Sequence, residues 1–493
     1  MTEGGSRAIA EDVLATQDAG GKAARGSAIR ILGYVLGVAM LLVSVPLLTR
    51  HLGVAGFGSY VTVLSLTSIV SLAADAGLTI TGVREYAIRS PQDRSQLIAN
   101  ILSLRLLIAA SGMLLAICFA VVAGYEPTLI VGTGLAGGGV LLFSIYQTYT
   151  IPLASDLRLG LVTAFDLLRQ ALTVGCVLVL IAAGAGVTAF LAIPIPVGIV
   201  VAVATAIAIR HVVRLWPGFD RVERRLLLRA TIPVASASIL AALFYKIAIV
   251  MMSVLSSDEE TGYFGASLRV VEVIVPIASL ITAAAFPLLV RAASNAPNRL
   301  VNGMQLLFEI ACILGAAMSV MLVVGAEPVM QFVGGDEFDP AVPVLQIQSI
   351  SVAASFLFAV WAAGLLAIHA QRSLVVATAV GVGSVVALTA LLVPARGAIG
   401  AAVAMTLAAT LLAAVTGLLL MRRRDLRVQV AVVPKVAIAL ACGLLVSLLE
   451  LPQTILAVLA ILTYFSVLSL VRGIPPEIRH IALSRWRATP GGS

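Results

Sequence analysis

Charged residues are scarce in this chain. Asp, Glu, Lys and Arg make up 11% of its 493 residues and aromatic residues only 5%, whereas 60% are hydrophobic. This balance excludes an ordinary soluble protein, which could not bury so much apolar surface. Apolar stretches of about 20 residues recur along the chain, and each could cross a hydrocarbon core of about 30 Å. We therefore predict an all-α, polytopic membrane protein.

Cysteine and histidine are equally rare, with four of each. Cys118, Cys176, Cys312 and Cys442 all lie in apolar segments, without the spacing of a metal site or a disulfide framework. The histidines form no paired-ligand motif, no Walker motif occurs, and no nucleophile–base pair stands out. We therefore expect no metal, no cofactor and no enzymatic activity, so that any transport is secondary rather than ATP-driven.

Fourteen apolar segments are long enough to form membrane-spanning helices. They lie roughly at 28–48, 57–81, 97–122, 128–150, 163–184, 187–209, 230–255, 263–290, 300–324, 341–367, 373–393, 398–420, 431–450 and 453–471. The connections between them are too short to hold a soluble domain.

The remaining charges alternate from loop to loop. Lys and Arg concentrate in one set of loops, as in "RRRDLR" at 422–427, whereas acids collect in the other set, in "SSDEETG" at 256–262 and "GGDEFD" at 334–339. By the positive-inside rule the basic loops are cytoplasmic. Both termini are then cytoplasmic, which agrees with an even number of spans. The net charge of +8 is thus a signal of topology rather than of nucleic-acid binding.

Two segments resemble each other, "VPLLTRHLGVAGFGSYVTVLSL" at 45–66 and "MMSVLSSDEETGYFGASLRV" at 251–270. Each runs from an apolar helix end through a polar loop to Gly, an aromatic residue, a second Gly and a new helix. Their offset of about 206 residues corresponds to six spans. Because six is even, both halves would enter the membrane in the same sense, as parallel repeats about an axis along the membrane normal, with a substrate site between them.

This duplication predicts how the chain is organised. We expect a cytoplasmic tail at 1–27, an N-lobe of six helices at 28–209, a linker at 210–229, a C-lobe of six helices at 230–421, two further helices within 422–471 and a cytoplasmic tail at 472–493. The linker, "RHVVRLWPGFDRVERRLLLR", mixes arginine with aromatic and leucine residues. It could lie as a surface helix at anionic headgroups or simply tether the lobes, and the two interpretations are compatible.

Charged residues inside apolar segments are candidates for function, because each must face protein, water or substrate. Lys246 lies about ten residues, or roughly 15 Å, from the outer end of its segment, so we expect it to face a central cavity or to pair with an acid. Arg269 and Glu272 share one helix face and could form a structural pair, or supply a cavity cation and a gating or proton-linked acid. Arg105 could reach the headgroups or the cavity. Glu309 lies deep enough to carry a proton.

Further charges lie near the inner ends of segments. Asp166 and Arg169 are one turn apart and are expected to form an interfacial ion pair. Asp75 marks the inner end of the second segment, where helix capping or a salt bridge is the simpler interpretation and gating the functional one. Arg84 and Glu85 follow it and are candidates for a cytoplasmic gate.

The order of these motifs resembles that of a known family. "LTRHLGVAGFGSYVTVLSLTSIVSLAADAGL" (48–78) followed by "VREYA" (83–87), "GYFGASLRVVEVI" (262–274) and "FVGGDEFDPAVPVLQIQSI" (332–350) resemble motifs of the polysaccharide flippases. These are the lipid-linked oligosaccharide, or O-antigen (Wzx-type), branch of the multidrug/oligosaccharidyl-lipid/polysaccharide exporter (MOP) superfamily. The resemblance covers roughly residues 28–420, and the last two helices fit the fourteen-helix members. In one departure, many relatives carry an acid close to the position of Lys246.

The resemblance implies two six-helix lobes in a V, as in MATE transporters, plus two C-terminal helices. It implies alternating access that moves a polyprenyl-diphosphate oligosaccharide from the cytoplasmic to the outer leaflet of a bacterial plasma membrane, for surface polysaccharide or lipopolysaccharide synthesis. A diphosphate in the membrane needs cations in place of water, and Lys246, Arg269 and Arg105 are the candidates. Coupling to H⁺ or Na⁺, contact with membrane lipids, and a polymerase and glycosyltransferases as partners are expected with it. The alternatives are a lipid II flippase and a cation-coupled multidrug antiporter of the same fold.

Overall fold

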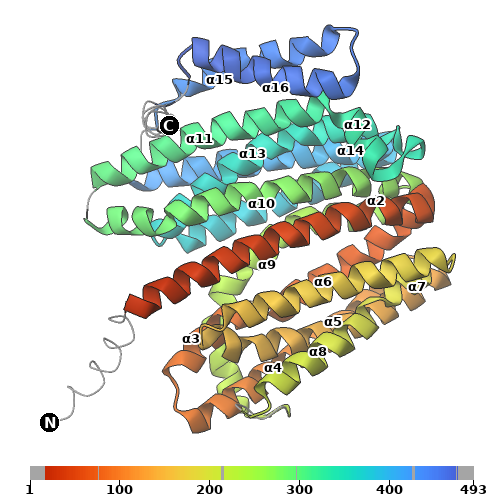
Figure 1. The fold of residues 1–493 in the computed structure, drawn as a ribbon, viewed down its shortest axis with the longest axis vertical. Coiled ribbons are helices and arrows are strands. Elements are labelled where there is room, and N and C mark those ends of the chain that lie inside the picture. The colour runs from red at the N-terminus through yellow and green to blue at the C-terminus, as the bar shows by residue number, and fades with distance from the viewer. Residues whose placement is uncertain are drawn as a thin grey trace, which may run out of the picture. The chain divides into compact units, whose positions relative to one another are not determined.

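Helices are the regular secondary structure of the described chain (Figure 1). The computed structural model describes residues 17–75, 77–211, 216–295, 297–424, 428–473 and 475. The helices are α2 (Gln17–Asp75), α3 (Leu78–Ile88), α4 (Pro91–Val122), α5 (Pro127–Ser155), α6 (Leu159–Ala182), α7 (Val187–Ala192), α8 (Pro194–Ile209), α9 (Arg221–Leu255), α10 (Asp258–Asn295), α11 (Pro297–Val324), α12 (Ala326–Gly334), α13 (Ala341–Ala367), α14 (Gln371–Arg424), α15 (Val432–Leu445) and α16 (Gln453–Leu470), with 3₁₀ turns η1 (Asp336–Phe338) and η2 (Val446–Leu448).

These helices account for the fourteen predicted spans. Within the described residues, ten helical segments are long and apolar enough to cross a membrane, one of which, Val187–Ile209, joins α7 to α8. Shorter apolar helices lie at Ile239–Leu255 and Val432–Leu448. Two of the ten, those containing most of α2 and α14, each cover two predicted spans, because a kink divides them. The predicted all-α, polytopic membrane fold is therefore confirmed. The short helices α3 and α12 were not predicted as separate elements, since each has fewer residues than a span.

Glycines at positive φ produce the two kinks. Gly53 has a φ of 67° and Gly397 a φ of 51°, values that favour glycine because a Cβ atom is strained there. A new helix that starts after a kink has backbone N–H groups without helical partners. At Gly397 the Glu260 carboxylate accepts a hydrogen bond from the Ala398 N–H at 2.5 Å. This acid also complements the positive end of the helix dipole, so Glu260 stabilises the second half of α14.

The chain divides into two units, which we describe separately. The first contains the chain up to His51 together with Val63–Ile239, and the second contains Leu52–Thr62 together with the chain from Leu240 onward. A short segment of α2 thus belongs to the second unit, although its neighbours on both sides belong to the first.

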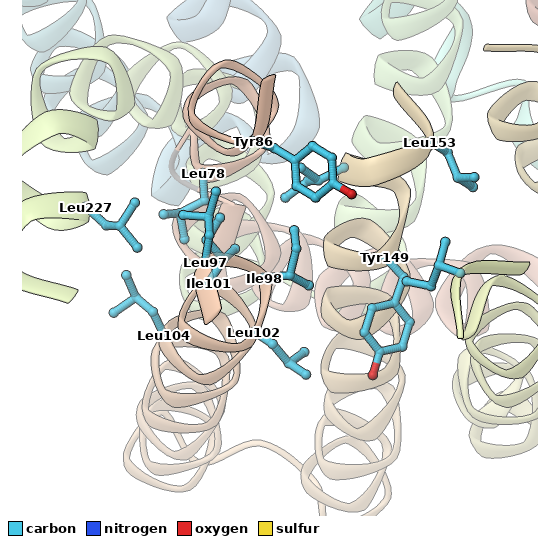
Figure 2. Close-up of a cluster of buried hydrophobic side chains, with 12 residues drawn as sticks. Leu78, Tyr86, Leu97, Ile98, Ile101, Leu102, Leu104, Tyr149, Leu153 and Leu227 are labelled. Atoms are coloured by element: carbon cyan, nitrogen blue, oxygen red, sulfur yellow. The ribbon is translucent and has the colours of Figure 1, made fainter. Parts of the chain in front are cut away.

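The core of the first unit surrounds α5, which packs against α3, α4 and α8. Tyr86 of α3 and Leu97 of α4 belong to a buried apolar cluster there. Leu227, from the first turns of α9, points toward Leu78 and Leu97 within the same cluster (Figure 2). The beginning of α9 is therefore anchored in the core of the first unit.

The second unit is organised around α13, which packs against α10, α11 and α14. The C-terminal pair α15 and α16 packs against α11 (Figure 1). Tyr464 of α16 is fully buried there, and its hydroxyl donates a hydrogen bond to the Ile313 carbonyl at 2.9 Å. Other large apolar side chains of this pair, such as Leu448 and Leu470, are more than 70% exposed, as expected for residues that face lipid.

Two glycine contacts in the second unit join the two segments that the sequence analysis matched with each other. A Cβ atom at Gly58 would overlap the Asp258 carbonyl oxygen, and one at Gly262 would overlap the Val54 carbonyl oxygen. The two contacts are equivalent if 54 corresponds to 258 and 58 to 262, which is an offset of 204 residues. This value is close to the offset of about 206 residues predicted from the two motifs.

We predict that alanine at either contact destabilises the protein. In Gly58→Ala or Gly262→Ala the new methyl group meets backbone, which cannot rotate away, and overpacking of this kind typically costs about 1–3 kcal/mol. The melting temperature of the detergent-solubilised protein should fall in both variants. Gly383→Ala in α14 is the matched control, because a Cβ atom there has nothing within 4 Å. Equal melting temperatures for Gly262→Ala and Gly383→Ala would contradict this account of the contact.

Candidate substrate-binding site

A cluster of three charges joins α9 and α10 in the second unit. Lys246 of α9 donates a hydrogen bond to one carboxylate oxygen of Glu272, and Arg269 donates to the other at 3.0 Å. The exposure of the three side chains lies between 15% and 24%. Lys246 therefore pairs with an acid, one of the two interpretations that its depth allowed. Two cations share one anion, so the cluster has a formal charge of +1.

The cluster lies far from the start of its helix. Glu272 is 14 residues beyond Asp258, the first residue of α10, which at about 1.5 Å per residue is roughly 21 Å. Isolated charges at such depth are costly, and mutual pairing offsets part of that cost. Because Glu272 neutralises only one of the two cations, the cluster can still attract an anion.

A pocket with a volume of about 480 Å³ lies on the same face of α10 as this cluster. Its lining includes Val275, Ser279, Thr282 and Phe286, which follow Glu272 at intervals of three or four residues and so share its helix face. The other walls come from α9, α13 and α14. This pocket was not predicted from the sequence. The spacing along α10 was visible, but the facing helices could not be assigned.

A second charged cluster lies in the first unit. Arg105 of α4 is fully buried, and its guanidinium donates hydrogen bonds to the Asp75 carboxylate, to the Thr79 hydroxyl at 2.6 Å and to the Thr148 hydroxyl at 3.2 Å. The Thr79 hydroxyl in turn donates to Asp75 at 2.6 Å. A side chain with no exposed surface does not reach headgroups, so that interpretation of Arg105 is wrong. Its role toward a substrate stays a prediction.

Arg105 bridges the break between α2 and α3. Asp75 is the last residue of α2, and Thr79 is the second residue of α3. Asp75 caps this break through Thr79 and also forms a salt bridge with Arg105, so both of its simpler interpretations are present. The partner was not predicted, because it lies 30 residues away on another helix.

The two gate candidates differ in their surroundings. Arg84 is exposed, whereas Glu85 pairs with Arg89 of the same helix region at 3.6 Å. Arg89 also forms an ion pair with Glu223 of α9. The buried Asn100 amide donates to Glu223 as well. Glu223, which lies in the predicted linker, is thus the shared partner of Arg89 and Asn100, and Arg84 is not part of this group. A gating role for Arg84 and Glu85 stays a prediction.

The linker is fastened to the first unit by its backbone. The Gly218 N–H donates to the Ala99 carbonyl and the Asp220 N–H to the Asn100 side chain, both at 2.9 Å. The predicted surface helix over 210–229 is only partly present: residues 212–215 lie outside the described residues, 216–220 are not helical, and helix begins at Arg221. Pro217 and Gly218 disfavour an earlier start.

Glu309 lies in α11 beside an amide group. Its carboxylate accepts a hydrogen bond from the Gln305 side chain at 2.6 Å, and Gln305 also exchanges hydrogen bonds with the Gln429 backbone at 2.7 and 3.0 Å. Glu309 has no ion-pair partner in the part of the chain that the structure describes. Among the same residues, no group of three or more His, Cys, Asp or Glu is placed to hold a metal ion.

The predicted ion pair between Asp166 and Arg169 is wrong. Asp166 instead accepts a hydrogen bond from the Tyr146 hydroxyl at 2.7 Å. The Arg169 guanidinium lies over the Phe143 ring, 5.4 Å from its centroid. Aromatic residues of α5 therefore provide partners for both side chains, in place of the neighbour on their own helix.

The helices are arranged as in a known class of membrane transporter. The lipid II flippase MurJ in an inward closed conformation matches with a TM-score of 0.71 at 12% identity, over 90% of this chain and 98% of that chain. An inward-facing multidrug resistance MATE family transporter of the MOP superfamily matches with 0.64 at 13% identity, over 79% and 94%. An outward-facing one matches with 0.57 at 13% identity, over 82% and 95%. The fold is that of MOP-superfamily transporters, as predicted.

The sequence defines the family within this fold. The model of the polysaccharide biosynthesis protein family matches residues 47–343, which is more than half of the chain. The chain belongs to this family, which agrees with the polysaccharide branch that its sequence motifs resemble. A comparison with curated proteins finds no significant match. The solved structures that share the chain's fold are named as a flippase and as transporters.

Proposed function

We propose that this chain moves a polyprenyl-diphosphate-linked oligosaccharide from the cytoplasmic to the outer leaflet of a bacterial plasma membrane by alternating access. The observation that carries the proposal is the net positive cluster of Lys246, Arg269 and Glu272 within apolar helices. Membership of the polysaccharide biosynthesis family supports a glycan as the cargo. The fold supports a lipid-linked form of it, because one protein of the same fold is named a lipid II flippase.

The chemistry of the cluster suits a diphosphate. A diphosphate that leaves water loses its hydration, and charge-assisted donors replace it most effectively. Lys246 and Arg269 already point their donors at one carboxylate, so a phosphate can compete with Glu272 for the same groups. When no substrate is bound, Glu272 keeps the Lys246 and Arg269 side chains oriented, and a bound phosphate would take its place. Competition from Glu272 also weakens the net binding of the diphosphate, which allows the substrate to leave.

The alternatives differ in how well this cluster serves them. Lipid II also carries a polyprenyl diphosphate, so the cluster suits it equally and only the sugar distinguishes the two. A multidrug antiporter for cationic drugs needs a site with excess negative charge, which a cluster of charge +1 opposes. We therefore rank the antiporter third.

Energy coupling and topology complete the proposal. Glu309 is the candidate for carrying a coupled proton, because it is held by an amide rather than by a cation. The distribution of basic loops supports a cytoplasmic position for both termini. A polymerase and glycosyltransferases are the expected partners in polysaccharide synthesis.

The test is transport by the purified full chain in proteoliposomes. The rate of leaflet exchange should be highest for a polyprenyl-diphosphate oligosaccharide, lower for lipid II and absent for a cationic dye. A pH gradient should accelerate exchange, and Glu309→Gln should remove that acceleration without removing exchange itself. Exchange of lipid II alone, or transport of the dye alone, would overturn the proposed substrate. An equal response of Glu309→Gln and wild type to the gradient would remove Glu309 from coupling.

A further inference from the structure

The pocket of the second unit lies next to the charge cluster, and the proposed function gives it no role. Resting on that function, we infer that the pocket holds the first isoprene units of the carrier lipid whose diphosphate the cluster binds. The remainder of the long chain would stay in the bilayer. The inference rests on the chemistry of the walls, on the position of the pocket along α10, and on its size.

The walls of the pocket offer hydrocarbon rather than hydrogen bonds. Phe244, Phe286 and Phe358 contribute aromatic surface. Three of the four hydroxyl groups in the lining are already engaged: Thr282 donates to the carbonyl groups one turn earlier in α10 at 3.0 and 3.1 Å, Ser355 donates to the Ser351 carbonyl at 2.9 Å, and the Tyr245 hydroxyl lies 3.2 Å from that of Ser355. The pocket therefore suits an apolar ligand and has little to offer a sugar.

The position of the pocket indicates what kind of apolar ligand it takes. Val275 and Ser279 follow Glu272 by one and two turns on the same face of α10, so the pocket continues directly from the cluster. On α9, the lining residue Tyr245 immediately precedes Lys246. A ligand that fills both places has an anionic head attached directly to a hydrocarbon chain, as a polyprenyl diphosphate has.

The size and contour of the pocket favour part of a branched chain. About 480 Å³ lies within the range of roughly 300–1,000 Å³ that is usual for small-molecule sites, which is enough for a few isoprene units but not for a whole polyprenol. Alanines at 241, 283, 359 and 362 leave room for methyl branches between the aromatic walls. Phe286 and Phe358 line the pocket, and aromatic rings offer flat apolar surface to planar double bonds.

The pocket would contribute position rather than affinity. Hydrocarbon gains little free energy on leaving lipid for an apolar pocket, because both surroundings are apolar. Seating the first isoprene units, however, fixes the distance between the chain and the phosphates. The seated isoprene units thereby hold the diphosphate against Lys246 and Arg269, so that less entropy is lost when these contacts form.

Filling the pocket tests this inference. Ala283 lines the pocket and Ala284 does not, yet both are exposed neighbours on α10, so Ala283→Phe and Ala284→Phe form a matched pair. Ala283→Phe should slow the exchange of a polyprenyl-diphosphate oligosaccharide in proteoliposomes by about tenfold. Ala284→Phe should leave the rate at the wild-type level. Equal rates for the two variants would overturn the inference.

A binding measurement that does not depend on transport identifies the ligand. A polyprenyl diphosphate with a diazirine on its first isoprene should label α10 or α13 at pocket residues, and Ala283→Phe should abolish this labelling. A phosphatidic acid with a diazirine near its head should not label them; equal labelling would mean that the occupant is bulk lipid and would overturn the inference. If the wild type moves no lipid-linked glycan, the proposed function fails. If it does so while the pocket stays unlabelled, only this inference fails.

Discussion

Replacing Lys246 with methionine should slow leaflet exchange of the lipid-linked oligosaccharide by about 10- to 100-fold per folded molecule. A hydrogen bond to a charged group contributes about 1.5–3 kcal/mol, and about 1.4 kcal/mol corresponds to a factor of ten in rate. Lys246→Arg should retain much of the activity, because the positive charge stays. Lys246→Glu should abolish it, since the cluster would change from +1 to −1.

The Lys246→Met variant is informative because it should still fold. Glu272 loses one partner but keeps Arg269 at 3.0 Å, so its carboxylate is not left uncompensated. The rate is measured in proteoliposomes and divided by the monodisperse protein recovered by size exclusion. Lys435→Met on α15 is the control, because the Lys435 ammonium contacts only the Arg472 carbonyl among the polar groups of the described chain. Wild-type exchange by Lys246→Met would show that Lys246 does not hold the substrate, and Arg269 would then be the residue to examine.

The ion pair of the first unit should respond asymmetrically to substitution. The Arg105 side chain has no exposed surface, whereas 33% of the Asp75 side chain is exposed. Asp75→Asn therefore leaves a buried cation without its anion, a loss that typically costs about 3–5 kcal/mol. Arg105→Met leaves a partly solvated carboxylate that still accepts from Thr79, so its cost should be smaller.

Thermal unfolding in detergent can establish this order. Asp75→Asn should give the lowest melting temperature, and the double variant Asp75→Asn/Arg105→Met should recover part of the loss, because it removes the unpaired cation. Arg84→Met is the control, since Arg84 is exposed. If Arg105→Met proves the more harmful single change, or if the double variant melts below Asp75→Asn, the ion pair does not stabilise the helix break as described.

The fourteen segments could be predicted from the sequence because lipid imposes a minimum length of apolar chain on every span. The kinks at Gly53 and Gly397 left that pattern intact. Hydropathy therefore predicted the two spans on either side of each kink, but it did not reveal that both spans belong to one nearly continuous helix, α2 or α14. The break after Asp75 was missed for the opposite reason. The helix resumes at Leu78 after only two residues, which is too short an interruption to lower the hydropathy of a span.

The charged residues show which contacts cannot be predicted from the spacing along a single helix. Spacing of i, i+3 correctly paired Arg269 with Glu272 and wrongly paired Asp166 with Arg169. Such spacing shows that two side chains can meet, but partners from neighbouring helices decide whether they do. Tyr146 of α5 competes for Asp166, whereas Lys246 of α9 adds to the existing pair at Glu272. Helix-to-helix contacts of this kind carry no periodic signal in a single sequence.

The assignment of Leu52–Thr62 to the second unit makes the two units interleaved. The polypeptide passes between them three times, at 51/52, 62/63 and 239/240, rather than once at a single tether. Gly53, with its positive φ, lies beside the first of these crossings. Cutting the chain at the linker would therefore not yield two self-sufficient halves. The C-terminal fragment would lack the α2 residues Leu52–Thr62, which include the Val54 carbonyl against which Gly262 packs. The surface of α10 around Gly262 would then be exposed in that fragment.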